Sequence, residues 1–210
     1  MKAEERRERE IAHARLDILD AAIRAFARSG LHRTTMQDIA HEAGYTAASL
    51  YTYFKSKQEI VDAMSNQLTD EYVQVFEQPL PSGLSFRQRF ELMAQRQLEL
   101  AEKRRNVFNV FLDADPPADA CSAEGRAFHS NFERRVAALA KWLQQNAKPD
   151  DLGGNDPRLI ARLLFGMAFG LLHQWGDKTQ PASFVDYAPI ITEFFFNGVS
   201  SKPKTGARKK

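Results

Sequence analysis

A single cysteine, Cys121, occurs among the 210 residues, so the chain cannot form an intramolecular disulfide. Absence of disulfides fits a reducing compartment, and we expect a cytoplasmic protein. Residues 1–10 alternate basic and acidic side chains without an apolar core, unlike a secretory signal peptide. Arg162 and His173 interrupt the most apolar segment, and the apolar stretch at 184–199 is too short to cross a bilayer. We therefore expect no membrane association.

Sequence patterns typical of enzymes and metal sites are also missing. No glycine-rich phosphate-binding loop occurs, and Cys121 stands in a Pro- and Asp-rich stretch without an evident general base. The chain has five histidines, His13, His32, His41, His129 and His173, and no two of them have the spacing of metal ligands. We predict a protein that is not an enzyme and that needs no metal or cofactor. A cluster of His129 and His173 across helices is the alternative, although core or surface histidines are commoner.

The chain also lacks a large excess of charge of one sign, since its formal net charge is only +2. That balance does not by itself indicate a nucleic-acid partner, so the distribution of charge has to be considered. Between residues 24 and 57 basic side chains outnumber acidic ones: Arg24, Arg28, Arg33, Lys55 and Lys57 against Asp38 and Glu42. This local surplus favours a polyanionic partner for the N-terminal part.

Strand-like alternation of apolar and polar residues is absent, whereas helical periodicity recurs along the chain. Pro-, Gly- and Asp-rich breaks at 79–83, 113–119, 149–154 and 176–181 separate the helical segments. The sequence therefore predicts an all-α fold of about nine helices. Arg6, Arg7 and Arg9 are expected in a solvated, disordered arm, with contact to a DNA minor groove as the alternative.

Two very short helices and the start of a third are predicted within residues 34–60. Thr35 can cap a helix beginning at Met36, with Asp38 three residues later, and Thr46 can cap the next. Residues 56–59, Ser-Lys-Gln-Glu, have the pattern of a capping box for the third helix. Gly44 can adopt the left-handed conformation that ends the first helix. Such closely spaced helix starts are typical of a helix-turn-helix.

The segment from about residue 11 to 64 resembles the DNA-binding domain of the TetR family of bacterial transcriptional repressors. The resemblance lies in residues 44–54, Gly-Tyr-Thr-Ala-Ala-Ser-Leu-Tyr-Thr-Tyr-Phe, and in the following pair Ser56-Lys57. The chain departs from the commonest family pattern at Tyr45, where a small aliphatic residue is usual, and at Ala48, where glycine is frequent. The resemblance implies a sequence-specific DNA-binding regulator, expected to be a repressor that a small apolar ligand releases.

On this basis we divide the chain into three parts. Residues 1–55 are the predicted three-helix DNA-binding domain, and residues 56–200 a larger helical domain for ligand binding and dimerisation. Residues 201–210 are a basic tail expected to be disordered. A helical adaptor that binds proteins but not DNA is the alternative function. It explains the long amphipathic helices but leaves the short capped pair around Gly44 without a reason.

Residues 46–53 are the helix expected in the major groove of double-stranded DNA. Ala47 and Ala48 are small enough for the backbone to approach base edges, and Ser49, Tyr51 and Thr52 can contact bases or phosphates. By resemblance, four positions hold phosphates: Thr35, Thr46, Tyr53 and Lys57. Arg33 completes the candidate DNA-binding set. Packing beneath the motif is the competing interpretation for Tyr51 and Tyr53.

The last two predicted helices, at 157–175 and 184–199, are apolar on more than one side. One side can pack within the chain, but an apolar patch left in water promotes association. We predict a two-fold homodimer, which implies a palindromic operator. Its candidate interface residues are Leu163, Met167, Gly170, Leu171, Ile191, Phe194 and Phe195. Gly166 and Gly170 would permit close approach of the helices.

Aromatic residues with a few polar neighbours in the second half suit a pocket for an unidentified small-molecule effector. The candidates are Phe108, Phe111, Phe128, His129, Phe132, Trp142, Phe169 and His173. Ordinary core packing explains each aromatic side chain equally well and is the commoner role.

Overall fold

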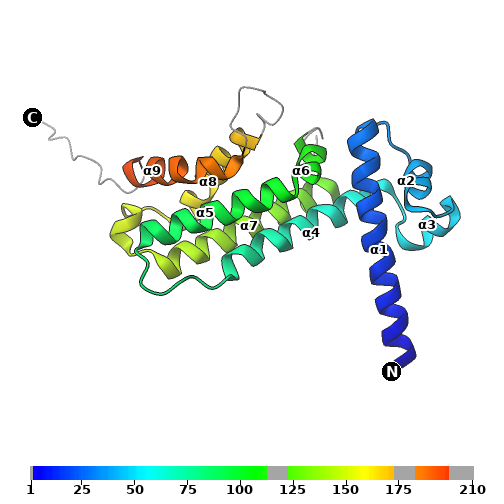
Figure 1. The fold of residues 1–210 in the computed structure, drawn as a ribbon, viewed down its shortest axis with the longest axis horizontal. Coiled ribbons are helices and arrows are strands. Elements are labelled where there is room, and N and C mark those ends of the chain that lie inside the picture. Colours follow the sequence, from blue (N-terminus) through cyan, green and yellow to red (C-terminus); the bar gives the residue numbers. More distant parts are fainter. Residues whose placement is uncertain (1, 113–122, 173–182, 199–210) are drawn as a thin grey trace, which may run out of the picture. The chain divides into compact units, whose positions relative to one another are not determined.

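The computed structural model describes residues 2–112, 123–172 and 183–198. Within these ranges it contains nine α-helices, two short 3-10 helices and no β-strand, which confirms the predicted all-α fold (Figure 1). None of these helices is long and apolar enough to span a membrane. Cys121, His173 and the predicted basic tail lie outside the described residues.

The chain forms two compact units. The first comprises Met1–Thr69 and Arg104–Asn131, and the second Asp70–Lys103 and Phe132–Lys210. Helices α4 (Lys57–Glu77) and α7 (Ala123–Asn146) each begin in the first unit and end in the second. The first unit thus extends beyond residues 1–55, and the functional boundary at residue 55 stays a prediction.

The first unit contains α1 (Lys2–Ser29), α2 (Met36–Ala43), α3 (Ala47–Tyr53) and α6 (Arg105–Leu112). Because α1 is helical from Lys2, the expectation of a disordered N-terminal arm is wrong. Local contacts favour the helix there: Arg6 Nε lies 2.8 Å from Glu10 Oε1, one turn away.

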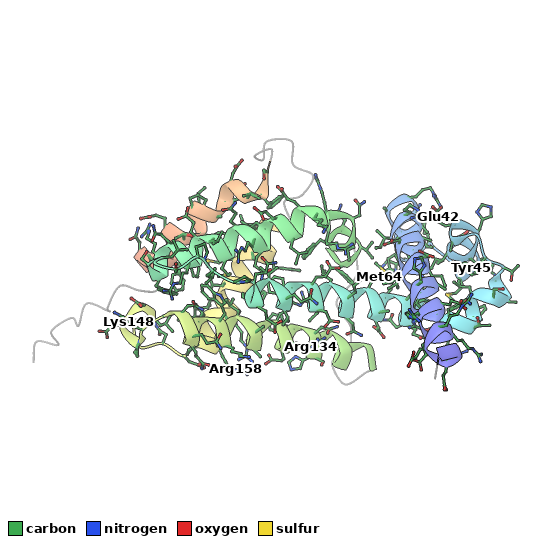
Figure 2. All side chains as sticks on the ribbon, turned by 60° about the horizontal axis from the view of Figure 1, so that its bottom comes forward. Glu42, Tyr45, Met64, Arg134, Lys148 and Arg158 are labelled. Atoms are coloured by element: carbon green, nitrogen blue, oxygen red, sulfur yellow. The ribbon has the colours of Figure 1, made fainter. Side chains whose placement is uncertain are left out.

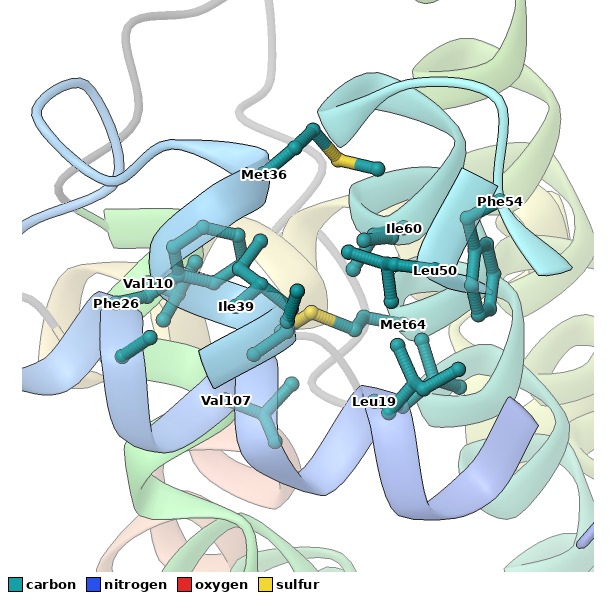
Figure 3. Close-up of a cluster of buried hydrophobic side chains, with 14 of the residues drawn as sticks. Leu19, Phe26, Met36, Ile39, Leu50, Phe54, Ile60, Met64, Val107 and Val110 are labelled. Atoms are coloured by element: carbon teal, nitrogen blue, oxygen red, sulfur yellow. The ribbon is translucent and has the colours of Figure 1, made fainter. Parts of the chain in front are cut away.

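One apolar core holds the first unit together, and its members come from five helices (Figure 3). Helix α2 contributes Ile39, and α3 contributes only Leu50 to the buried residues. Further side chains come from α1, α4 and α6, among them Phe26, Met64 and Val107. Helices of seven and eight residues are unstable alone in water, so α2 and α3 depend on these neighbours.

The second unit contains α5 (Phe86–Lys103), α8 (Pro157–Leu172) and α9 (Ala188–Gly198), with the 3-10 helices η1 (Pro149–Leu152) and η2 (Phe184–Tyr187). Residues 184–187, predicted to start the last helix, form η2 instead, and Pro189 occupies the first turn of α9, where proline is tolerated. Phe90 of α5 and Phe195 of α9 stack with ring centroids 4.3 Å apart.

Helices α8 and α9 leave large apolar side chains exposed in the single chain. The exposed side chains are Leu159, Leu163, Phe169, Ile190 and Phe194, called here the C-terminal apolar face. Among the candidate interface residues, Leu163, Gly170 and Phe194 are exposed, whereas Met167, Leu171 and Ile191 are half-buried. Phe195 does not belong to an exposed face, because it is fully buried against Phe90.

The candidate pocket residues are spread over both units. Phe108 and Phe111 pack against the core of the first unit, while Trp142 is buried beside Phe86 in the second. Phe132 packs edge-on against Phe165 at a centroid distance of 6.0 Å. His129 and Phe169 are exposed. The side chain of Phe128, like His173, lies outside the described part of the chain.

Candidate nucleic-acid interface

The start of α2 is fixed by the predicted pairing of Thr35 and Asp38. Thr35 Oγ1 accepts a hydrogen bond from Asp38 N at 3.2 Å, and Asp38 Oδ2 accepts one from Thr35 N at 2.8 Å, which completes a capping box. The Thr35 amide, and then its hydroxyl, hold the pKa of Asp38 below its ordinary value because both stabilise the carboxylate. The N-cap role of Thr35 is confirmed.

Gly44 ends α2 and forms the turn. Its backbone is left-handed, with φ 75° and ψ 22°, and its amide donates to carbonyl oxygens of the last turn of α2. Tyr45 N also donates to Ala40 O at 2.8 Å. This conformation is unfavourable for residues with a Cβ, so glycine is suited to the position.

Helix α3 begins at the predicted cap. Thr46 Oγ1 accepts a hydrogen bond from Ser49 N at 3.1 Å, and Phe54 N donates to Leu50 O at 3.0 Å where the helix ends. Leu50 is the buried residue of α3. The opposite side of the helix is therefore available to a partner.

The side chains of α3 fall into two groups. Ala48, Tyr51 and Thr52 are exposed, as is Thr46 at the cap, whereas Ala47 and Ser49 are half-buried. With 44% of its surface exposed, Tyr51 can reach a ligand outside the protein.

Tyr53 faces the protein in part. Its ring meets that of Tyr45 edge-on, with centroids 5.7 Å apart and planes at 67° (Figure 2 labels Tyr45). Tyr45 is the residue that departs from the usual small aliphatic one, and its contact with Tyr53 gives it a packing role in the turn.

Two of the basic residues in the local surplus are engaged with an acidic neighbour. Arg24 and Arg28 of α1 contact the Glu42 carboxylate at 2.8 and 2.9 Å. The hydrogen bonds from Arg24 and then Arg28 lower the pKa of Glu42. These contacts join α1 to α2 and reduce the positive charge that the surplus offers to DNA.

The remaining three basic side chains differ in their surroundings. Arg33 is exposed, and its Nε donates to Ser29 O at 2.8 Å, which leaves its terminal nitrogens available. Lys55 is exposed and donates to Tyr51 O. Lys57, whose predicted role is to hold a phosphate, is half-buried, and its Nζ donates to three backbone carbonyl oxygens, those of residues 31, 32 and 34.

Arg15 and the carboxylate of Glu59 make contacts at the end of α3 that the sequence did not predict. Arg15 donates to the carbonyl oxygen of Tyr53, lies 3.9 Å from the Phe54 ring centroid and contacts Glu59 Oε1 at 3.3 Å. Glu59 N donates to Ser56 Oγ as predicted, but the carboxylate accepts from Lys55 N at 2.7 Å. The capping-box pattern at 56–59 was the only sequence signal for Glu59.

Acidic, histidine and cysteine side chains do not gather into a group of three suited to a metal ion anywhere in the described ranges. The first unit contains a short, capped and exposed helix, α3, which follows α2 across a sharp turn. This is the geometry with which a helix-turn-helix enters the major groove.

Comparison with known proteins agrees with this geometry. Residues 18–64 match the family model for bacterial regulatory proteins of the tetR family. Over 99 residues the chain is 31% identical to the HTH-type transcriptional repressor KstR2 of Rhodococcus jostii, covering 47% of this chain and 48% of that protein. It is 22% identical to the uncharacterized HTH-type transcriptional regulator YhgD of Bacillus subtilis, across 88% of this chain and 95% of that protein.

The fold extends the likeness to most of the chain. The transcriptional regulator FadR from Bacillus subtilis, solved in complex with stearoyl-CoA, superimposes with a TM-score of 0.73 at 19% identity. The match covers 88% of this chain and 98% of that one. At this identity the structural likeness establishes a shared fold, while the family match covers the helix-turn-helix. Together they show a helix-turn-helix of the TetR family at residues 18–64 and support a DNA-binding transcriptional regulator with a TetR-like fold.

Proposed function

We propose that the chain acts as a homodimeric repressor that binds a palindromic operator and leaves it when a small apolar ligand binds the predicted regulatory domain, residues 56–200. The observation that carries this proposal is the exposed side of α3, which is capped at Thr46 and attached to its core through Leu50. Residues that fold the helix and residues that can meet DNA are thus on different sides.

The exposed side chains of α3 suit base recognition. Ala48 allows close approach to base edges or a thymine methyl group, and the Tyr51 hydroxyl can donate or accept a hydrogen bond. Thr52 Oγ1 already donates to Ser49 O at 2.7 Å, which leaves its methyl group and acceptor capacity for the groove. Thr35, Thr46 and Arg33 add exposed groups suited to phosphates.

The C-terminal apolar face supports dimerisation. Five large apolar side chains from α8 and α9 are between 49% and 62% exposed in the single chain, which favours association. A two-fold axis makes the two halves of the interface identical and presents two copies of α3. Copies about 34 Å apart, or somewhat more, meet successive major grooves and double the contacts.

Ligand control uses the continuity of α4, which begins beside the helix-turn-helix and ends in the second unit. A ligand that prefers a conformation with mismatched recognition helices shifts the population away from DNA. Complete release requires a difference in affinity of about 5 kcal/mol between the two conformations. Stearoyl-CoA in the similar Bacillus subtilis FadR makes long-chain acyl compounds the first class to test.

Fluorescence anisotropy with labelled duplexes from beside the protein's own gene tests the proposal. We expect binding to one duplex with steep salt dependence, much weaker binding to random DNA, and release by an apolar ligand. A complex indifferent to every ligand would argue for a regulator without an effector. Absence of salt-dependent duplex binding would favour the protein-binding adaptor.

A further inference from the structure

We propose that Lys57 is a positioning residue that fastens the start of α2 to the first turn of α4, and that its ammonium is not a phosphate ligand. The part of this inference that is tested by DNA binding rests on the proposed function. The positioning role itself can be tested without DNA.

The geometry around the Lys57 ammonium uses its full donor capacity. Nζ lies 2.9 Å from Leu31 O, 3.3 Å from His32 O and 3.0 Å from Thr34 O. An ammonium has three N–H donors, and here three carbonyl oxygens accept them. Binding a phosphate would require breaking at least one of these charge-assisted hydrogen bonds.

The three carbonyl oxygens belong to the loop between α1 and α2, directly before the N-cap Thr35. Thr34 is buried, and its hydroxyl donates back to Gly30 O at 2.8 Å, so the loop is folded over itself. Carbonyl dipoles that converge on one point repel each other unless a positive charge lies between them. Lys57 supplies that charge and fixes where α2 begins.

The same turn of α4 also holds the far end of the motif. Two residues after Lys57, the Glu59 carboxylate accepts a hydrogen bond from Lys55 N and contacts Arg15, which donates to the last carbonyl of α3. One helical turn is therefore bonded both before α2 and after α3. Displacement of the start of α4 would carry the two short helices together.

The test uses the full-length protein with Lys57→Met, Lys57→Arg and, as the matched control, Arg33→Met. Arg33 lies in the same loop but is exposed, so it serves as the predicted phosphate contact for comparison. Operator affinity is measured over a series of salt concentrations. Losing one phosphate contact in each protomer lowers the salt slope by about 1.8 for a dimer.

For a positioning residue we expect Lys57→Met to weaken operator binding without changing the salt slope, whereas Arg33→Met lowers the slope. Lys57→Arg should also weaken binding, because a planar guanidinium cannot direct its donors to the same three carbonyls. A lowered slope for Lys57→Met together with wild-type affinity for Lys57→Arg would identify a phosphate ligand and overturn the proposal.

Hydrogen exchange without DNA provides the independent readout. We expect amides at the start of α2, including Asp38 N, to exchange about tenfold faster in Lys57→Met while those of α5 stay unchanged. Unchanged exchange at α2 would overturn the positioning role. If the wild-type protein bound no duplex, the proposed function would fail, and the exchange result would still decide the role of Lys57.

Discussion

Two adjacent phenylalanines in α9 should affect different steps, folding and dimerisation, when each is replaced by alanine. Phe195 is fully buried and stacks on Phe90, whereas Phe194, one residue earlier, is 62% exposed on the C-terminal apolar face. We expect Phe195→Ala to destabilise the folded subunit and Phe194→Ala to weaken the dimer.

The magnitudes follow from burial. Removing a fully buried phenylalanine ring costs about 3 to 5 kcal/mol of unfolding free energy. Phe194 has most of its surface left to bury. Its burial at the interface should contribute about 1 to 2 kcal/mol of association free energy for each protomer, and twice that across a two-fold interface. The dimer dissociation constant should therefore rise roughly 30-fold to 700-fold.

Urea denaturation at several protein concentrations, combined with sedimentation equilibrium, separates the two effects. At concentrations where the wild-type chain is monomeric, Phe194→Ala should unfold within about 0.5 kcal/mol of the wild type. Phe195→Ala should unfold at much lower urea at every concentration. An unchanged association constant for Phe194→Ala would refute the assignment of this face, and a stable Phe195→Ala subunit would refute the packing of α9.

Three further predictions concern substitutions in the first unit. Gly44→Ala should lower the free energy of unfolding by about 1 to 2 kcal/mol and the melting temperature by roughly 2 to 8 °C. The cause is the left-handed backbone at this position, since the added Cβ would meet no other atom. An unchanged melting curve would count against that backbone strain. Tyr51→Ala should weaken operator binding about tenfold and random-sequence binding little, so equal losses in anisotropy titrations would contradict its reading role. Glu42 stabilises the fold above its ordinary pKa, and this contribution disappears as the pH falls through the lowered pKa. Glu42→Gln should thus flatten the acid side of the melting-temperature profile, and parallel profiles would argue against the ion pairs with Arg24 and Arg28.

Features that depend on neighbouring residues were predictable from the sequence. The Thr35 and Asp38 pair is three residues apart, and a capping box needs no information from elsewhere in the chain. Gly44 could be placed because few residues other than glycine adopt its conformation. The all-α fold followed from helical periodicity, which is likewise local.

Contacts between distant residues could not be predicted in this way. Arg15 meets the carbonyl of Tyr53 across 38 positions, and no local pattern in the sequence distinguishes it from the other arginines of α1. Lys57 reaches Leu31 across 26 positions, and no residue close to Lys57 in the sequence indicates the loop whose carbonyl oxygens it binds.

Burial in α9 was ambiguous for a different reason. Residues 194–196 are three consecutive phenylalanines, so hydrophobicity marks no single side of the helix. Successive residues point about 100° apart, and the packing of Phe195 against Phe90 and Phe86 decides that it faces inward. The sequence therefore identified an apolar helix but misassigned one of its interface residues.

Attachment of α3 through Leu50 also affects how such a regulator diverges after gene duplication. Outward-facing positions can accept new side chains without disturbing the apolar residues beneath, because surface substitutions rarely alter stability by more than about 0.5 kcal/mol. Duplicated copies can thus acquire different operators while one scaffold is preserved. For the same reason, exchanging those few positions is a direct way to retarget the protein in the laboratory.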